Sequence, residues 1–167
     1  MKHQANKGER IAKIIARAGL ASRRESEKLI LDGRVKVNGK TINSPALNLT
    51  KNDVIEVDGK LLLPPEQTRL WIYNKPVGLV STSKDEKNRP TIFDNLPKEL
   101  PRVVSIGRLD LNSEGLLLLT NDGELKRRLE LPSTGWLRRY RVRVKGKLKD
   151  SMLEPLRHGI FVEGTHF

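Results

Sequence analysis

The sequence of 167 residues predicts an α+β protein built as a helix-helix-sheet module followed by a mixed, mostly antiparallel sheet domain. Three observations predict it. Apolar residues follow a helical period near the N-terminus, short alternating runs with Asn-Gly and Asp-Gly turns come next, and Pro64-Pro65 then interrupts the pattern. We expect a flexible basic leader over 1–8, the module over 9–63, a linker over 64–68 and the second domain over 69–167.

The module begins with two predicted helices. From Glu9 onward, apolar side chains recur at helical spacing as far as Ala18, and Gly19 is a plausible end. Ser22 followed three residues later by Glu25 is a capping-box signature, so a second helix should begin there and run to about Leu31.

Short strands should complete the module. Residues 34–37 alternate between polar and apolar and lead into Asn38-Gly39, a strong hairpin signal. Residues 53–57 alternate again and end at Asp58-Gly59. The sequence therefore predicts a small sheet rich in hairpins.

The second domain should contain strands, turns and short helices in mixed order. The predicted strands are 69–74, 79–82, 103–106, 136–146 and 160–162, and the predicted helical segments are 92–96, 124–131 and 149–158.

One stretch, GRLDLNSEGLLLLTNDG at 107–123, stands out for its chemistry. The leucine run 116–119 is too short for a membrane span and reads as a buried strand bounded by turns. Asp110 and Arg108 would then lie on a loop tied to a rigid central strand, where proteins often carry reactive groups. The alternative is that Asp110 is simply a turn residue.

The charge balance points to a polyanionic partner. Lys and Arg number 32 against 20 Asp and Glu, so the formal net charge is +12. Nucleic acid is the first candidate, an anionic membrane surface the second, and a merely soluble basic surface the remaining alternative. The candidate RNA-binding cations of the module are Arg10, Lys13, Arg17, Arg23, Arg24 and Lys28. Because the module has no aromatic residue, we expect it to recognise RNA shape and backbone rather than stacked bases.

Other classes of protein are disfavoured by what the sequence lacks. It has no cysteine and only three histidines, so we expect no disulfide and no metal site. No apolar run approaches the roughly 20 residues of a membrane-spanning helix, and the N-terminus has no apolar signal-peptide core. We expect a cytoplasmic monomer with no membrane partner.

The run WLRRYRVRVKG at 136–146 has two faces as a strand. Tyr140, Val142 and Val144 fall on one face, and the cations Arg139, Arg141, Arg143 and Lys145 fall on the other. The cationic face could follow an RNA backbone or could simply be solvated. Tyr140 could meet a stacked base or the protein core.

Two resemblances make these patterns specific. GERIAKIIARAGLASRRESEKLILDGRVKVNGKTI resembles the small RNA-binding module first known from ribosomal protein S-four, which binds structured RNA through basic helices. YNKPVG at 73–78, RPTIFDNLP at 89–97, GRLDLNSEGLLLLTNDGEL at 107–125 and RRYRVRVKG at 138–146 resemble the bacterial ribosomal RNA pseudouridine synthases of the RsuA family, with most similarity to the RluB-type large-subunit branch.

The second resemblance implies an enzyme that isomerises uridine to pseudouridine in ribosomal RNA, 23S in the RluB type, without cofactor or metal. The family's essential aspartate maps onto Asp110, which would either attack the substrate or abstract a ribose proton. Arg108 would support the carboxylate and fill the space left by a flipped base. Tyr140 would pack on that base, and Lys75 would shape the floor of the cleft.

The resemblance also implies a later motif, bearing Arg and Asn, that completes the catalytic sheet. Residues 147–167 do not resemble it, so we expect this chain to be C-terminally truncated, with an incomplete sheet and an exposed edge. The alternative function is therefore a non-catalytic ribosomal RNA-binding protein or an inactive fragment of the synthase.

Overall fold

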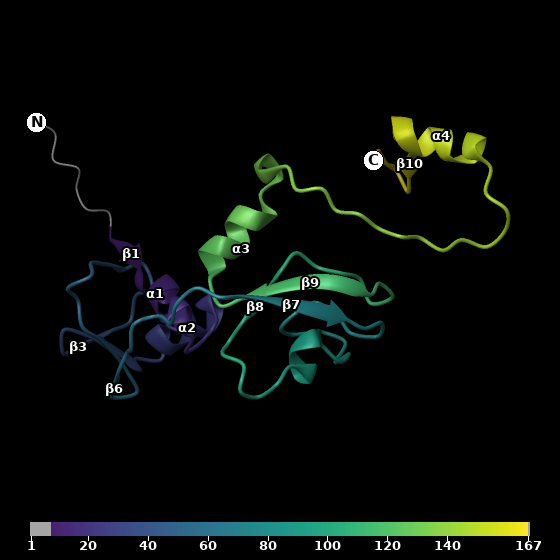
Figure 1. Cartoon of the computed structure of the whole chain (residues 1–167). Helices are drawn as coiled ribbons and strands as arrows, with labels where there is room; N and C mark the ends of the chain where they lie inside the picture. The colour runs from purple at the N-terminus through teal and green to yellow at the C-terminus, as the bar shows by residue number, and fades with distance from the viewer. Residues whose placement is uncertain (1–7, 167) are drawn as a thin grey trace, which may run out of the picture. The chain divides into compact units, whose positions relative to one another are not determined.

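The computed structural model describes residues 8–166, which form two compact units that divide between Gly135 and Trp136. The fold is α+β, with helices and short antiparallel sheets alternating along the chain (Figure 1). The expected leader lies outside the described residues except for Gly8. Within residues 8–166, no helix has the length and apolar character needed to cross a membrane.

The N-terminal module contains two helices and a four-stranded sheet of order β3-β2-β5-β6. Apolar side chains of both helices, including Ile11, Ile15 and Ile30, are fully buried in one core with Val35 and Val57 of the sheet. The elements are α1 (Ile11–Arg17), α2 (Arg23–Leu31), β2 (Val35–Val37), β3 (Lys40–Ile42), β5 (Ile55–Val57) and β6 (Lys60–Leu61), together with the separate pair β1 (Glu9–Arg10) and β4 (Asn48–Leu49).

The first helix begins two residues later than the sequence predicts. Glu9 and Arg10 pair with Leu49 and Asn48 in an antiparallel ladder. The amide of Ile11 donates to the Leu47 carbonyl at 3.0 Å. These main-chain groups are committed to a strand, so helical geometry starts only at Ile11.

The other local signals of the module are confirmed. The Ser22 hydroxyl accepts from the Glu25 amide at 3.2 Å, and the Glu25 carboxylate accepts from the Ser22 amide at 2.7 Å, which completes the capping box of α2. These hydrogen bonds to Ser22 lower the pKa of Glu25. Asn38 and Gly39 have φ of 49° and 78°, as a two-residue hairpin turn of type I′ requires.

The second sheet has three antiparallel strands in the order β7-β9-β8. The leucine-rich strand is central, and Leu118 is paired with Ile72 on one side and Ile106 on the other. The helix α3 contacts β8, and the 3-10 helix η1 follows the loop after β7. The elements are β7 (Leu70–Lys75), η1 (Ile92–Asn95), β8 (Val104–Ile106), β9 (Gly115–Thr120), α3 (Gly123–Glu130) and η2 (Pro132–Thr134).

Only alternate leucines of the central strand are buried, so the expectation of a wholly buried run is wrong. Leu117 and Leu119 are 3% and 1% exposed and pack in a second core with Ile92, whereas Leu116 is 67% exposed. Successive side chains of a strand point to opposite faces. Within the described residues only the face of Leu117 and Leu119 is covered by such a core.

Residues 79–82 do not form the predicted strand. Val80 makes a single parallel bridge to Thr91, through hydrogen bonds of 3.1 Å to the Pro90 carbonyl and 3.0 Å from the Ile92 amide. The apolar residues Leu79 and Val80 are buried all the same. Their burial explains why the segment has the composition of a strand without being one.

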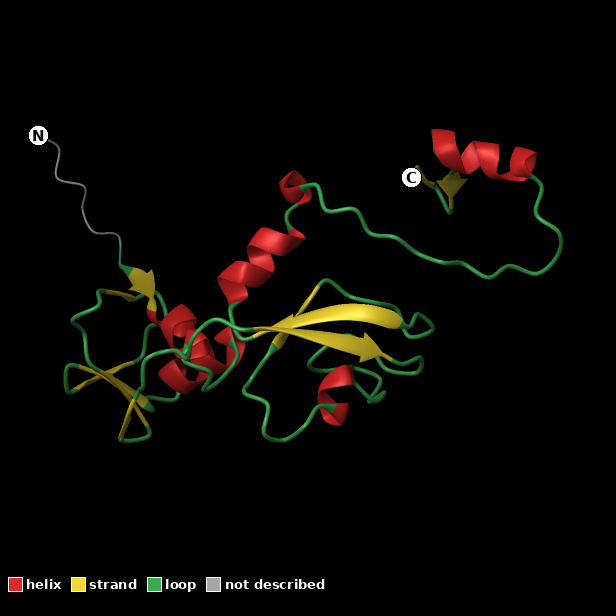
Figure 2. Cartoon of the chain, in the orientation of Figure 1, coloured by secondary structure: helices red, strands yellow, loops and turns green. Residues whose placement is uncertain are grey.

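The C-terminal unit differs most from the sequence prediction. Residues 137–145 are exposed and adopt neither helix nor strand, so the predicted strand over 136–146 is wrong for this structure (Figure 2). No strand within residues 8–166 pairs with this segment, and an extended chain is stable as a strand only when its main-chain groups are paired. The remaining elements are α4 (Asp150–His158), β10 (Phe161–Val162) and β11 (Thr165–His166), of which the two strands form a hairpin.

The alternation along β9 yields a matched pair of variants. Leu119→Ala should lower the free energy of unfolding by about 2–5 kcal/mol because it leaves a cavity in the second core. Leu116→Ala, on the exposed face of the same strand, should change it by less than about 1 kcal/mol. Urea denaturation of both variants measures the difference, and equal losses would contradict the assigned faces.

Candidate active site

The loop that contains Asp110 joins two neighbouring strands, β8 and β9, of the second sheet. It begins at Gly107, whose φ of 73° lies in the left-handed region that glycine adopts without strain. Arg108 and Asp110 are exposed, whereas Leu109 between them packs against the second core. The loop therefore presents its two charged side chains outward from an anchored backbone.

Lys75 fastens this loop from beneath. It is the last residue of β7 and its side chain is fully buried. Its Nζ donates to three main-chain carbonyls, those of Pro76 at 3.0 Å, Asp110 at 2.9 Å and Ser113 at 2.7 Å. An ammonium group has three donors, so each is used. Burial lowers the pKa of Lys75, and the charge of Asp110 opposes that shift.

Ser81 holds the loop at Leu109. Its hydroxyl donates to the Leu109 carbonyl at 2.8 Å and accepts from the Leu109 amide at 3.1 Å. The amide of Gly78 adds a third contact between the two segments, at 2.8 Å from the Leu111 carbonyl. Both main-chain groups of the residue before Asp110 are thus fixed by one side chain.

The helix α3 secures the start of the loop. Glu130 accepts from the Gly107 amide at 2.6 Å and pairs with Lys126 at 2.5 Å, while Lys126 also donates to the Ser105 carbonyl at 2.6 Å. Burial raises the pKa of Glu130, but the hydrogen bonds from Lys126 and Gly107 outweigh it and lower the pKa. The Arg108 charge acts in the same direction.

Asp110 takes part in a turn through its main chain but not through its side chain. Its carbonyl accepts from the Ser113 amide at 3.1 Å, which closes a four-residue turn. Within residues 8–166, no hydrogen bond or ion pair engages its carboxylate, and none joins it to Arg108. The carboxylate is therefore exposed, while its own main chain is held in place.

The six candidate cations of the module fall into two groups. Arg10, Arg23, Arg24 and Lys28 are exposed, and the ion pairs within residues 8–166 do not involve them. Lys13 and Arg17 are instead paired with acidic groups. Lys13 pairs with Glu9 at 2.5 Å and with Glu124 of α3, and Arg17 pairs with Glu9 at 3.0 Å.

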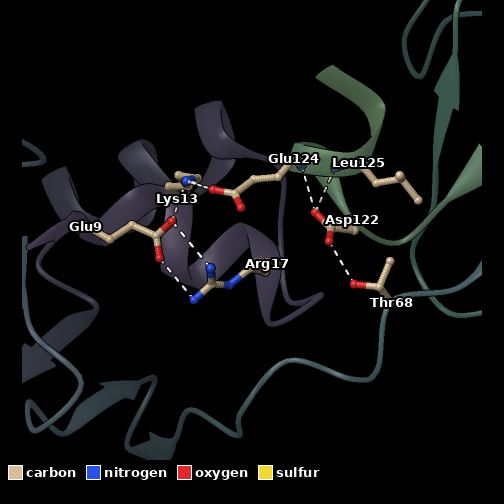
Figure 3. A network of polar contacts seen from close by, with 7 residues as sticks. All are labelled: Glu9, Lys13, Arg17, Thr68, Asp122, Glu124 and Leu125. Atoms are coloured by element: carbon tan, nitrogen blue, oxygen red, sulfur yellow. Dashed lines mark hydrogen bonds and ion pairs between the residues drawn. The ribbon is translucent and has the colours of Figure 1, made fainter. Parts of the chain in front are cut away.

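Figure 3 shows how these pairs form one polar network with the start of α3. The hydrogen bonds of Lys13 to Glu124 and Glu9 raise the pKa of Lys13, and the same bond to Lys13 lowers that of Glu124. Asp122 caps α3 by accepting from the amides of Glu124 and Leu125, and it also accepts from the Thr68 hydroxyl at 2.8 Å. The network fixes the end of the linker and the first helix to the second sheet domain.

Tyr140, Arg139, Arg141 and Arg143 lie in the irregular part of the C-terminal unit. All four are exposed, and Tyr140 is 62% exposed. Of the residues predicted from sequence, the structure places Arg108 and Asp110 on one loop and connects Lys75 of β7 to that loop through hydrogen bonds. Sequence reasoning missed Ser81, Lys126 and Glu130, because hydrogen bonds to distant main-chain groups leave no local pattern.

A metal centre is not formed by the described residues. Across residues 8–166, His, Asp and Glu side chains gather in no group of three or more suited to hold an ion.

Comparison with known proteins matches two families to successive parts of the chain. Residues 9–55 match the family described as S4 domain, and residues 69–163 match the family described as RNA pseudouridylate synthase. The second match spans more than half of the chain. The chain belongs to the RNA pseudouridine synthase family, whose members are isomerases that act on uridine in RNA.

Individual relatives lead to the same family. An "Uncharacterized RNA pseudouridine synthase" of Rickettsia felis is 54% identical over 159 residues, which are 95% of this chain and 69% of the relative. A "Ribosomal large subunit pseudouridine synthase B" of Pseudomonas aeruginosa is 45% identical over 161 residues, which are 93% of this chain and 42% of the relative.

A solved structure supports the fold. A "Crystal structure of pseudouridylate synthase" superposes with a TM-score of 0.53 at 27% identity, covering 95% of this chain and 68% of the other. This likeness spans both the S-four module and the second sheet domain. The α+β fold and the family are therefore supported by sequence and by structure.

The Lys75 contacts can be tested without any activity measurement. Lys75→Met should lower the free energy of unfolding by about 2–4 kcal/mol, because carbonyls of the loop lose their buried donor. Hydrogen exchange at the Ser113 amide should accelerate as the turn opens. Lys87→Met, which changes an exposed lysine in the loop after β7, serves as the control. An unchanged exchange rate at Ser113 would show that Lys75 does not hold the loop.

Proposed function

We propose that this chain converts uridine to pseudouridine in large-subunit ribosomal RNA, with Asp110 as the catalytic residue. The observation that carries the proposal is the exposed Asp110 carboxylate on a loop whose backbone is fixed by Lys75, Ser81 and Glu130. Catalysis is favoured when a reactive group is held in its working position before the substrate arrives.

The reaction explains why one carboxylate is central. The bond between uracil N1 and ribose C1′ breaks, the base turns, and a bond forms between uracil C5 and ribose C1′. The proton on C5 is released to water, and N1 takes up a proton. A carboxylate can begin this sequence by attacking an electron-poor centre or by abstracting a ribose proton. Both paths need a carboxylate that the substrate can reach, as an exposed Asp110 allows.

Other side chains would serve the flipped base. A base extruded from a stack costs a few kcal/mol and needs a surface to receive it. We assign that surface to Tyr140. Arg108 would fill the space that the base leaves and would support the Asp110 carboxylate. Arg139, Arg141 and Arg143 would bind phosphates beside Tyr140. Residues 9–63 would grip the RNA, and residues 69–167 would carry the chemistry.

The choice of large-subunit RNA rests on relatives. The Pseudomonas aeruginosa protein and one from Xanthomonas campestris, 43% identical over 164 residues, are both described as ribosomal large subunit pseudouridine synthase B. The chain spans 42% and 33% of those two proteins. The net charge of +12 fits a substrate that is a long polyanion.

Replacement of the carboxylate provides the direct test. Asp110→Asn should reduce tritium release from an unmodified large-subunit transcript labelled at uridine carbon 5 by at least about 10²-fold. RNA affinity should stay within about twofold, because the Asp110 side chain takes no part in the described fold. Equal release from both proteins would remove Asp110 from catalysis. Binding without release by the unaltered chain would favour the RNA-binding alternative.

RNA binding by the module has its own test, with ion-paired cations as the reference. Replacing Arg23 and Arg24 by Ala should weaken binding and reduce the slope of log affinity against log salt by about 1.8, two phosphate contacts' worth. Replacing Lys13 and Arg17 should reduce the slope less, because their charges already face Glu9 and Glu124. An unchanged slope in the first pair would contradict phosphate binding there.

A further inference from the structure

A groove of about 750 Å³ lies between the start of α2 and two segments of the second sheet domain. One wall carries Ser22, Arg24 and Glu25 of the N-terminal module. The opposite wall consists of Ser83 and Lys84, together with residues between Phe93 and Val103. Part of this wall belongs to the motif RPTIFDNLP at 89–97, to which the sequence assigned no binding role.

The cations and the carboxylates that line the groove differ in the contacts that they make within residues 8–166. Four cations line it, Arg24, Lys84, Lys98 and Arg102, and the ion pairs within residues 8–166 involve none of them. Two carboxylates also line it, but each is engaged in the capping of its own helix.

The capping contacts are direct. Glu25 accepts from the Ser22 amide at 2.7 Å, and Asp94 accepts from the Thr91 amide and hydroxyl, both at 2.8 Å. Both carboxylates are therefore held against their own backbone. The groove keeps an excess of two positive charges, four cations against two carboxylates, that can face a ligand.

Two segments that line the groove continue in sequence toward the loop that carries Asp110. Ser83 and Lys84 follow Ser81, whose hydroxyl holds Leu109, and Val103 precedes β8, which runs into Gly107. On the first wall, Arg24 adjoins the exposed Arg23 of α2. A ligand in the groove would touch the module on one side and segments that continue to Asp110 on the other.

We propose that this groove binds the phosphodiester backbone of the substrate RNA, with Lys84, Lys98 and Arg102 as phosphate contacts and Arg24 on the facing wall. The proposal deepens the function proposed above and rests on it for the identity of the RNA. An RNA strand is favoured over an acidic peptide because the cations stand on both walls and continue into the basic surface of α2.

The groove is lined by apolar side chains as well as by cations. Phe93, Leu96 and Leu100 line it and also pack against the second core, so they are anchored in the domain. A lining of both kinds suits an RNA backbone, because phosphates can meet the cations while sugars contact the apolar surface.

The test uses the full chain and an unmodified large-subunit transcript. The double variant Lys84→Gln, Lys98→Gln should weaken RNA binding at least about fivefold and reduce the salt slope by about 1.8. The control Arg127→Gln, Arg128→Gln removes the same charge from exposed positions of α3, outside both the groove and the N-terminal module. The control should leave affinity within about twofold. Equal losses in both pairs would assign the effect to net charge and overturn the groove.

A second measurement locates the RNA. Because the chain has no cysteine, Lys98→Cys creates a unique attachment point for an iron-chelate cleavage probe. Strand scission at discrete backbone positions is expected to be stronger than with Arg128→Cys carrying the same probe on α3, outside the groove. Scission no stronger than with the control, or unchanged RNA affinity in the Lys84 and Lys98 double variant, would overturn the proposal and point to an acidic peptide.

The two proposals fail separately. Asp110→Asn should lose tritium release and keep the groove-dependent affinity. If the unaltered chain binds RNA through the groove but releases no tritium, the catalytic assignment fails and the groove proposal stands. If the unaltered chain releases tritium normally and the groove variants bind RNA with normal affinity, the groove proposal fails and the catalytic assignment stands.

Discussion

The buried ammonium group of Lys75 is the interaction on which the candidate site depends. It stands at the end of one strand and reaches three carbonyls, two of them in the loop before the central strand. Burying a cation is costly unless every donor finds an acceptor, and here all three do. The sheet and the loop that carries Asp110 therefore form one hydrogen-bonded assembly rather than a strand with a flexible appendage.

The helix α3 extends that assembly toward the N-terminal module. Near its first turn, Glu124 pairs with Lys13 of α1, and at its last residue Glu130 holds the Gly107 amide. Exposed ion pairs contribute little to stability individually, so their value here lies in orientation. The same pairs divide the cations of α1 and α2 into those engaged within the protein and those without an ion pair among residues 8–166.

Local signals in the sequence predicted most of the N-terminal module. The capping box at Ser22 and the turns at Asn38-Gly39 and Asp58-Gly59 involve residues close in sequence, so a pattern in the sequence is enough to place them. Features that depend on contacts between distant parts of the chain were not predicted. Leu79 and Val80 are buried without a strand, and residues 136–146 show strand alternation without a partner strand among residues 8–166. Asp110 and Lys75 were found through family motifs, whereas Ser81 and Glu130 required the folded chain.

The acceptors of Lys75 are all main-chain oxygens, so these hydrogen bonds hold the loop without using the Asp110 side chain. Any residue at position 110 offers the same carbonyl, so the loop can keep its course when its carboxylate is removed. A substitution there reports on reactivity without disturbing the fold. The same independence would let a related chain change the chemical group at this position while it inherits the loop unaltered.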